Sequence, residues 1–434
     1  MGIFYHGDCL FVMHHDIPPE SVDLIYLDPP FFTGKIQKGK WRPEAMEISY
    51  EDSKKFWAEA EKVKAMREKA PAWLHHVALK RADFASYLYY MMVRLQACHR
   101  VLKKTGSIYL HCDYRASHYL KMVMDEVFGF SNFRNEVIWH RNSGGIGRTS
   151  FNKRHDTLLN YSKTDDYFYN GKSVGDLREQ NEGTFGGYFG TDKNGRKYRE
   201  VRKGGKVYKY YMDEPKNPDD VWNIAQIPER DKTERVGYPT QKPEELLRRI
   251  IRTSSKEGNT VLDPFCGCGT TVIAASRLNR EWIGIDIDTS PREKGKLPTA
   301  FQVIQNRSHS LFDQAKYITR DLSEVAEMDG QAFEVWVSEF YKATKPKPDR
   351  GVDGITQNGI PIQAKAYQIK YPVLSEFVTN AKLHPAVAKP VKEIIIVSQT
   401  GFDDSARKRK FEIETSEGIK VRLETPETML SLEV

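Results

Sequence analysis

A short acidic loop near the start of the chain carries groups that could hold an amine. Asp28, Pro29, Pro30 and Phe31 follow the apolar run 24–27. Two consecutive prolines stiffen the backbone and remove two N–H donors, so the loop presents a carboxylate and backbone carbonyls as acceptors. Acceptors beside an aromatic ring suit an exocyclic amine on a flat base that stacks on the ring, worth roughly 1–3 kcal/mol. The alternative interpretation is a rigid exit from a strand.

A second loop, far downstream, has the composition of a nucleotide-binding turn. The run 260–262 leads into the loop 263–271, in which Gly267 and Gly269 precede a predicted helix. Glycines let the backbone approach a ligand closely, and a helix N-terminus offers free N–H groups. Asp286 ends the following predicted strand, near the separation expected for an acid that binds two ribose hydroxyls. The loop has no third glycine, which favours a ligand without a pyrophosphate, such as S-adenosylmethionine; a tight structural turn is the alternative.

Both loops occur within a β-α-β alternation, which predicts an α/β fold with a doubly wound sheet. Gly106 is expected to end a long amphipathic helix before the next strand begins. The expected strands are 24–27, 107–111, 136–139, 260–263 and 282–286, and the expected helices are 83–104, 115–128, 246–251 and 270–278.

The composition describes a globular chain without a membrane span. Of 434 residues, 39% are hydrophobic and 29% charged, and no apolar run approaches the roughly 20 residues that cross a bilayer. The N-terminus lacks the charged start and apolar stretch of a signal peptide, so we expect a cytoplasmic protein. The odd count of five cysteines predicts no disulfide framework, and Cys266 and Cys268 are too close for the usual zinc knuckle. The net charge of +7 permits a nucleic-acid partner without requiring one.

The regular alternation is interrupted in three places. Residues 32–80 form a Lys- and Glu-rich insertion, residues 141–235 are crowded with glycine, lysine and tyrosine, and residues 289–320 form a connector in which Pro291 and Pro298 disfavour a long helix. A second unit begins near residue 321, and the length suggests two to three domains in all. The expected elements of this second unit are helices 329–343 and 373–383 and strands 359–366 and 394–397.

Five short motifs lie at or beside these predicted elements. They are Gly7-Asp8-Cys9, Asp28-Pro29-Pro30-Phe31, Thr105-Gly106-Ser107-Ile108-Tyr109-Leu110-His111, Tyr238-Pro239-Thr240-Gln241-Lys242-Pro243 and Asp263-Pro264-Phe265-Cys266-Gly267-Cys268-Gly269-Thr270-Thr271. Together, and in this order, they resemble the motifs of the beta class of DNA amino-methyltransferases, in which the catalytic motif precedes the cofactor motif. The resemblance covers residues 1 to about 310 and implies a Rossmann-like methyltransferase sheet with an inserted target recognition region at about 140–235.

The resemblance also implies a reaction: transfer of a methyl group from S-adenosylmethionine to a base amine in double-stranded DNA. Asp28 and the Pro29 carbonyl would accept the amine protons and offset the positive charge that develops. Phe31 would stack on the base, which must flip out of the duplex. Asp286 would hold the cofactor ribose. By the same resemblance, Asp263, Phe265, Gly267 and Gly269 would form the cofactor pocket, with Asp8 and Lys242 as weaker contacts.

The acidic first position of the Asp-Pro-Pro-Phe motif favours adenine N6 as the methyl acceptor. Enzymes of the family that act on cytosine N4 more usually carry Ser-Pro-Pro-Tyr, and cytosine stays the alternative. An RNA methyltransferase and a DNA-binding module without catalytic activity in its second unit are further alternatives. Members of the family often form homodimers, so a dimer is one expected assembly.

Target recognition is expected within 140–235. Arg141, Arg148, Lys153 and Arg154 occur there without an intervening acid and among glycines. A flexible basic loop of this kind suits contacts with DNA phosphates. The alternative is a solvated surface loop.

The second unit, 321–434, contains a different acidic motif. Asp353, followed by Gln363 and Lys365 on one predicted strand, resembles the D-x(n)-[EQ]-x-K layout of the Mrr-like branch of the restriction-endonuclease fold. Alternation places Gln363 and Lys365 on one face of the strand. The resemblance implies that Asp353 holds Mg²⁺ with help from Gln363, that Lys365 stabilises the attacking water or the phosphate charge, and that Glu334 is the acid of the preceding helix. Glutamine where many nucleases carry glutamate weakens metal binding, so a domain that only grips DNA is the alternative.

Overall fold

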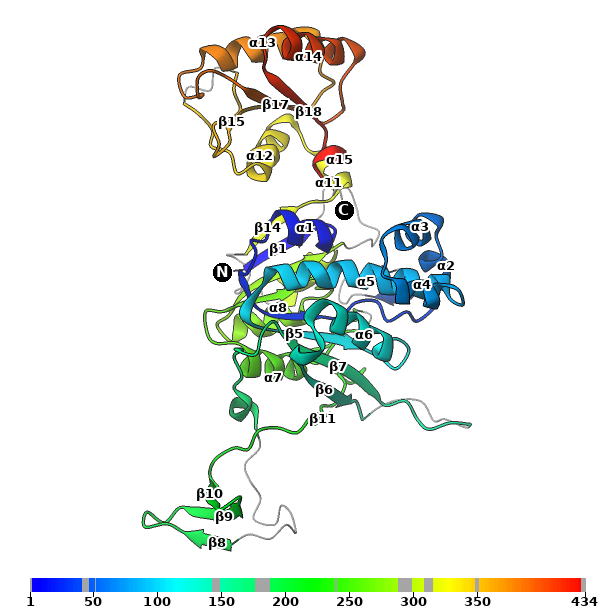
Figure 1. Ribbon diagram of the computed structural model, residues 1–434, viewed down its shortest axis with the longest axis vertical. Helices are drawn as coiled ribbons and strands as arrows, with labels where there is room; N and C mark the ends of the chain where they lie inside the picture. The colour runs from blue at the N-terminus through cyan, green and yellow to red at the C-terminus, as the bar shows by residue number, and fades with distance from the viewer. Residues whose placement is uncertain are drawn as a thin grey trace. The chain divides into compact units, whose positions relative to one another are not determined.

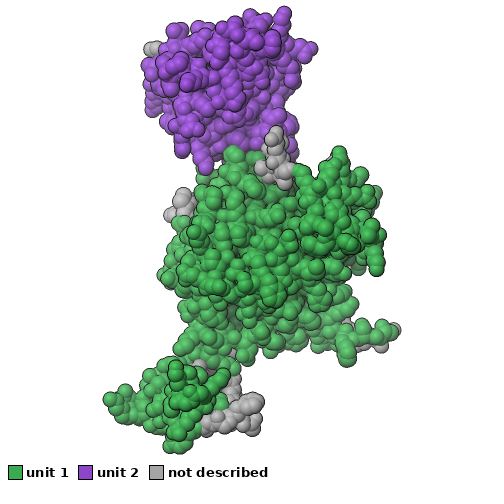
Figure 2. Space-filling model, viewed as in Figure 1, with its two compact units in different colours: residues 1–318 green, residues 319–434 purple. Residues whose placement is uncertain are grey.

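The computed structural model describes residues 2–40, 47–50, 52–142, 149–175, 188–238, 240–287, 299–307, 315–347 and 351–430. The chain divides into two compact units, residues 1–318 and 319–434 (Figure 2). Arg148 of the predicted basic loop, Pro239 of the fourth motif, and Pro291 and Pro298 of the connector lie outside the described residues.

Unit 1 is built on a mixed, mostly parallel sheet. Its described strands follow the order β11-β6-β7-β5-β2-β12-β13-β1-β14. The five neighbours from β5 to β1 are parallel, whereas β7 runs antiparallel to both β5 and β6. The predicted α/β fold class is therefore confirmed. The strands are β1 Gly2–His6, β2 Val22–Leu27, β5 Leu102–Cys112, β6 Phe133–His140, β7 His155–Ser162, β11 Val221–Asn223, β12 Thr260–Asp263, β13 Glu281–Asp286 and β14 Lys316–Thr319.

Both faces of this sheet are covered, which explains why its central strands are apolar throughout. In β2, Ile25 and Leu27 pack into one hydrophobic core, and Leu24 and Tyr26 pack into the other. Side chains that alternate along a strand point to opposite faces, so one continuous apolar run supplies two cores. The first core is completed by α1 Cys9–His15, α5 Ala82–Val101 and α6 Ser117–Phe128, and the second by α7 Glu244–Ser254, α8 Thr270–Arg277 and α9 Thr299–Arg307 (Figure 1).

The insertion after the Pro-Pro loop folds against α5. Its anchor is Asp52, which is fully buried and accepts hydrogen bonds from the Thr33 backbone N–H at 2.7 Å and the Trp57 indole N–H at 3.0 Å. The Trp57 ring then packs on Tyr87 of α5. One tryptophan ring, one tyrosine ring and one buried carboxylate thus hold this segment beside the loop that carries Asp28. The insertion comprises β3 Gln37–Lys40, β4 Glu47–Tyr50, α2 Lys54–Trp57, α3 Ala60–Lys69 and α4 Ala72–Ala78.

The prediction that Gly106 ends the long helix is wrong. The helix α5 ends at Val101, and Gly106 lies inside β5, which begins at Leu102. A Cβ atom at Gly106 would lie 2.9 Å from the backbone oxygen of Asp23, the second residue of β2. The glycine therefore serves the close approach of two neighbouring strands, a tertiary requirement that propensity along the chain does not reveal.

The region 141–235 is less irregular than the sequence suggests. It contains β7, which lies between β5 and β6 in the main sheet. Its strand was hard to predict because Asp156, Thr157 and Asn160 interrupt the apolar pattern although all three are buried. The same region holds the short 3₁₀ helix η2 Gly171–Val174, the strand β11, and a separate three-stranded antiparallel sheet of β8 Tyr188–Thr191, β9 Lys197–Lys203 and β10 Lys206–Tyr211.

Unit 2 contains its own mixed sheet and its own core. Its strand order is β15-β16-β17-β18, with β15 antiparallel to β16 and the other neighbours parallel. Helix α12 packs on β16, while α13 and α14 pack on β17 and β18. Leu374, Phe377 and Ile396 are among its fully buried core residues. The elements are α11 Leu322–Glu327, α12 Gly330–Phe340, β15 Gly354–Ile355, β16 Pro361–Lys365, α13 Tyr371–Leu383, β17 Glu393–Ser398, α14 Asp404–Ser416, β18 Lys420–Glu424 and α15 Pro426–Met429.

The start of α8 depends on a glycine in the left-handed region. Gly269 has φ +74°, and a Cβ atom there would lie 2.3 Å from Cγ1 of the fully buried Ile304. Gly258 has nearly the same φ, +78°, but its added Cβ would meet no heavy atom of the described structure within 4 Å. Gly269 thus satisfies two constraints, one of backbone conformation and one of space.

Replacing Gly269 by alanine should therefore destabilise the protein more than replacing Gly258. Both variants incur similar backbone strain, but only G269A must displace Ile304. We expect G269A to lower the free energy of unfolding by about 1–3 kcal/mol more than G258A. Urea denaturation followed by tryptophan fluorescence measures the difference, and equal losses in the two variants would contradict the packing role of Gly269.

Candidate functional site

A cavity of about 550 Å³ lies where β1, β2, β12 and β13 end. These strands are parallel neighbours, so the loops after them meet at one edge of the sheet although they are far apart in the sequence. The volume is in the range of pockets that enclose a small ligand. Of the predicted site residues, Asp8, Asp28, Pro30, Lys242, Asp263, Phe265, Gly267 and Asp286 line the cavity.

The Asp28 carboxylate has one engaged and one unengaged oxygen. Lys242 donates a hydrogen bond from Nζ to Oδ2 and a second, at 3.2 Å, to the Thr240 carbonyl. Oδ1 is buried and forms no hydrogen bond to any described residue. A buried acceptor without a partner costs free energy, so this oxygen is prepared to receive a donor from a ligand. Phe31 lies beside the pair, with Lys242 Nζ 5.1 Å from its ring centroid.

A fully buried histidine, His111, lies next to Asp28. His111 forms a 2.8 Å hydrogen bond with the Tyr26 hydroxyl through Nδ1, which also lies 3.8 Å from Asp28 Oδ1. Its Nε2 lies 3.4 Å from Asp156 Oδ2, and Arg141 approaches the other oxygen of Asp156 at 3.6 Å. Burial would raise the pKa of Asp156, but the His111 hydrogen bond and the charges of His111, Arg141 and Lys242 hold it below its usual value.

Three of these residues differ from the sequence prediction. The sequence predicts His111 only as part of a core strand and gives no role to Asp156. A histidine and an aspartate at buried strand positions were the available signals, but their meeting required the pairing of β5 with β7. Arg141 was expected to contact phosphate, and here it is partly committed to Asp156.

A second charge pair, between the buried Arg94 and the partly exposed Asp8, also lines the cavity. Asp8 caps α1, accepting from the Leu10 N–H at 2.7 Å, and its other oxygen accepts from Arg94 at 2.5 Å. The Arg94 guanidinium lies over the Tyr90 ring at 3.5 Å. Sequence reasoning missed Arg94 and Tyr90. A charged residue on the buried face of α5 was the signal, because arginine is almost never fully buried unless it is paired.

The glycine-rich loop is fixed by the two acids that flank it. Gly267 has φ +50° and donates its N–H to Asp286 Oδ2 at 2.6 Å. Asp263 is buried and accepts from the Phe265 N–H at 3.0 Å. Burial, and to a smaller extent the charges of Asp28 and Asp286, raises the pKa of Asp263 to about 7.

The remaining predicted residues of unit 1 lie around the cavity without lining it. Phe31 contacts the His111 ring with centroids 5.4 Å apart. Pro29 links Asp28 to the lining residue Pro30, and Gly269 starts α8.

All five cysteines of the chain are free and buried, and burial raises the pKa of Cys9 to about 12. Thiols of this kind are inert at neutral pH.

In unit 2 the predicted residues converge in part. Lys365 Nζ lies 3.6 Å from Asp353 Oδ2, which also accepts from the Ala364 N–H at 2.8 Å. Gln363 donates to the Gly351 carbonyl at 3.3 Å, and its buried Oε1 forms no hydrogen bond to any described residue. Glu334 lies on α12, the helix that packs on β16. Among the described residues, no group of three His, Cys, Asp or Glu side chains is arranged to hold a metal ion.

Replacing Asp263 by asparagine should change how stability depends on pH. A carboxyl whose pKa is raised on folding binds its proton more tightly in the native state, so its contribution to stability is highest at low pH and falls as the pH rises toward 7. The variant lacks this titration and can still accept from Phe265. We expect the thermal midpoint of D263N, relative to the parent chain, to rise between pH 5 and pH 8. The exposed D165N serves as control with a constant offset, and a flat difference for D263N would contradict the raised pKa.

Within the described ranges, every helix is too short or too polar to span a bilayer.

Residues 22–293, more than half of the chain, match the model of an N6/N4 family described as DNA methylase. The chain is 31% identical over 246 residues to the type II methyltransferase M.HpaI of Haemophilus parainfluenzae, covering 56% of this chain and 68% of the relative. It is 28% identical over 292 residues to the DNA adenine methyltransferase YhdJ of Escherichia coli strain K12, covering 65% and 78% respectively. Among solved structures, the cytosine-N4-specific PvuII DNA methyltransferase is similar with a TM-score of 0.43 at 14% identity, over 73% of this chain and 94% of that chain. The match of the family model over these strands and loops shows that the chain belongs to the N6/N4 DNA methylase family.

Proposed function

We propose that unit 1 transfers a methyl group from S-adenosylmethionine to the N6 amine of an adenine flipped out of double-stranded DNA. The observation that carries this proposal is the buried, unengaged Oδ1 of Asp28 at the edge of the cavity. An exocyclic amine is a donor of the right kind for that oxygen. The same cavity contains a glycine-rich loop and a second acid, Asp286, which suit a nucleoside.

The lining of the cavity fits S-adenosylmethionine. Asp286 lies at the end of β13, and its carboxylate accepts a hydrogen bond from the Gly267 N–H. A ribose bound there would therefore contact both the Asp286 carboxylate and the backbone of the glycine loop. Phe265 and Tyr90 offer rings, and Asp8, paired with Arg94, offers charge of both signs near the α1 N-terminus for an amino acid moiety. When bound, the cofactor supplies an electrophilic methyl group on a sulfonium.

The residues around Asp28 favour a transition state in which the amine becomes positive. Lys242 engages Oδ2 and so orients the carboxylate, leaving Oδ1 to accept an amine proton. The carboxylates of Asp28 and Asp156 lie near the two ring nitrogens of His111, with Lys242 beside Asp28 and Arg141 beside Asp156, so the Oδ1 atom of Asp28 is the negative group that meets the amine. Preorganised negative charge at a developing cation stabilises the transition state without prior deprotonation of the amine. Phe31 would stack on the base and His111 would position Asp28 through the network that it shares with Tyr26.

Two observations support adenine over cytosine. The Pro-Pro motif begins with Asp28, and one relative with 28% identity is named a DNA adenine methyltransferase. Cytosine N4 is the alternative, and nucleoside analysis of the methylated product separates the two. We place target recognition in residues 140–235, outside the strand β7, and treat dimer formation as a further expectation of the family.

A second candidate function is DNA cleavage by unit 2. The observation that favours it is the buried, unengaged Oε1 of Gln363, on the same strand as Lys365 and close to Asp353. Asp353 and Gln363 would hold Mg²⁺, with Glu334 from α12 as a third oxygen ligand, and the metal would activate a water. Lys365 would stabilise charge on the phosphate. With few acids nearby, a domain that only grips DNA is the alternative.

Replacing Asp28 by alanine should lower methyl transfer to duplex DNA by about a hundredfold or more. D28N keeps an acceptor of the same size and should retain more activity than D28A. Transfer of tritiated methyl from S-adenosylmethionine measures the rate, and D165N, at an exposed position, is the matched control. Unchanged transfer in D28A, with the fold intact by circular dichroism, would show that the amine binds elsewhere.

Replacing Lys365 by alanine should abolish any Mg²⁺-dependent cleavage of DNA. K392A, an exposed lysine of the same unit, should cleave like the parent chain. Unmodified, hemimethylated and fully methylated plasmids are each incubated with the full chain and Mg²⁺. If the parent chain cleaves none of the three but still binds DNA, the nuclease proposal fails and the gripping alternative stands.

A further inference from the structure

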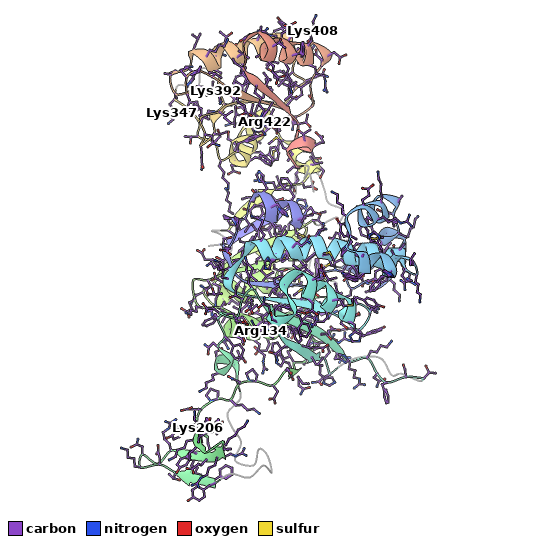
Figure 3. All side chains as sticks on the ribbon, viewed as in Figure 1. Arg134, Lys206, Lys347, Lys392, Lys408 and Arg422 are labelled. Carbon is purple, nitrogen blue, oxygen red and sulfur yellow. The ribbon has the colours of Figure 1, made fainter. Side chains whose placement is uncertain are left out.

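The three-stranded sheet of β8, β9 and β10 concentrates the positive charge of the chain. Residues 188–211 contain eight Lys and Arg and two Asp and Glu, a net charge of +6 (8 − 2), against +7 for all 434 residues. Every residue of the three strands is exposed or half-buried. A sheet that buries no residue of its own has both faces available for contact. Figure 3 labels Lys206 at the start of β10.

The strand register divides these residues between two different faces. Directly opposed residues of an antiparallel ladder share a face, and every second residue of a strand joins them. The pairs Lys206–Lys203 and Tyr208–Val201 and the row Tyr210–Arg199–Phe189 therefore lie together. This set, the acid-free face, consists of Phe189, Thr191, Lys197, Arg199, Val201, Lys203, Lys206, Tyr208 and Tyr210.

The opposite face carries one acid beside its two basic residues. Glu200 pairs with Arg202 at 3.5 Å, and Lys209 lies over the Tyr198 ring at 4.2 Å. Tyr198 and Tyr211 form an edge contact with centroids 5.9 Å apart. The acid of this face, Glu200, is thus engaged by a basic residue of the same face.

The acid-free face carries basic residues, and no acid of these three strands lies on it. Lys203 and Lys206 stand directly across from each other beside the Gly204-Gly205 turn, an arrangement of like charges that destabilises an antiparallel pair. Phe189 and Tyr208 expose 48% and 43% of their surface on this face. An anion between the two lysines would remove the repulsion, and tyrosine hydroxyls would donate to the same anion.

We propose that the acid-free face binds the phosphate backbone of duplex DNA. This inference rests on the proposed function, because it takes the substrate of the methyl transfer as the partner. Lys203 of β9 and Lys206 of β10 are cross-strand neighbours, and Lys197 lies on the same face farther along β9, so the face presents donors to more than one phosphate. Contacts of this kind hold the protein on DNA and carry no sequence information of their own.

The test compares two double variants of the full chain that each remove two positive charges. K203Q/K206Q alters the acid-free face, and R202Q/K209Q alters the opposite face of the same strands. Affinity for a fluorescent 30-base-pair duplex of arbitrary sequence is measured from 50 to 250 mM KCl. We expect K203Q/K206Q to weaken binding about tenfold or more at 100 mM and to lower the slope of log Kd against log salt by about two. R202Q/K209Q should keep most of the affinity and slope.

Methyl transfer by the same variants separates this inference from the proposed function. K203Q/K206Q should raise the KM for DNA and leave kcat at saturating DNA unchanged. Equal effects of the two variants on the salt slope, or none, would overturn the acid-free face as a DNA contact. If the parent chain transfers no methyl group to DNA but K203Q/K206Q alone loses binding, the proposed function fails and the surface assignment stands. Thermal midpoints equal to that of the parent chain confirm that the variants fold.

Discussion

The parallel arrangement of β1, β2, β12 and β13 is the constraint on which the rest of unit 1 depends. Parallel neighbours place their carboxyl ends at one edge, so the acids that follow these strands must share a small volume. Asp8, Asp28, Asp263 and Asp286 are brought together in this way. The apolar strands are thus selected for burial on two faces, and the chemistry is confined to the residues immediately beyond them.

Four carboxyl groups at one edge repel one another, and three kinds of interaction offset this repulsion. Asp28 pairs with Lys242, and Asp8 pairs with Arg94. Asp286 accepts a backbone N–H of the glycine loop. Asp263, which is fully buried, has a pKa raised toward neutrality and so carries less charge. The charged partners of Asp8 and Asp28 therefore come from α5 and from the segment before α7, far away in the sequence, whereas Asp8 and Asp263 also accept backbone N–H groups two residues further along the chain.

The sequence predicted the β-α-β order and the strands that end in Asp28, Asp263 and Asp286, because these strands are apolar and end in unusual loops. It wrongly predicted that Gly106 ends a helix, whereas this glycine allows the close approach of β5 to β2. It also failed to predict β7, because polar residues at buried positions obscure the period on which strand prediction depends. Prediction from the local sequence was correct where burial alone decides which residue type occupies a position. It failed where contact with a specific neighbouring residue decides the residue type.

By itself, the sequence determined the fold class, the family motifs and the identity of the acids at the candidate site, since apolar runs, prolines and glycines act locally. Only the tertiary structure decided which groups partner those acids. Arg94 lines the cavity from a helix, and His111 and Asp156 lie near Asp28 on two antiparallel strands whose pairing no spacing along the chain encodes. The same holds for the acid-free face, because the pairing of β9 with β10 places Lys197, Arg199, Lys203 and Lys206 on one face and Arg202 and Lys209, together with Glu200, on the other.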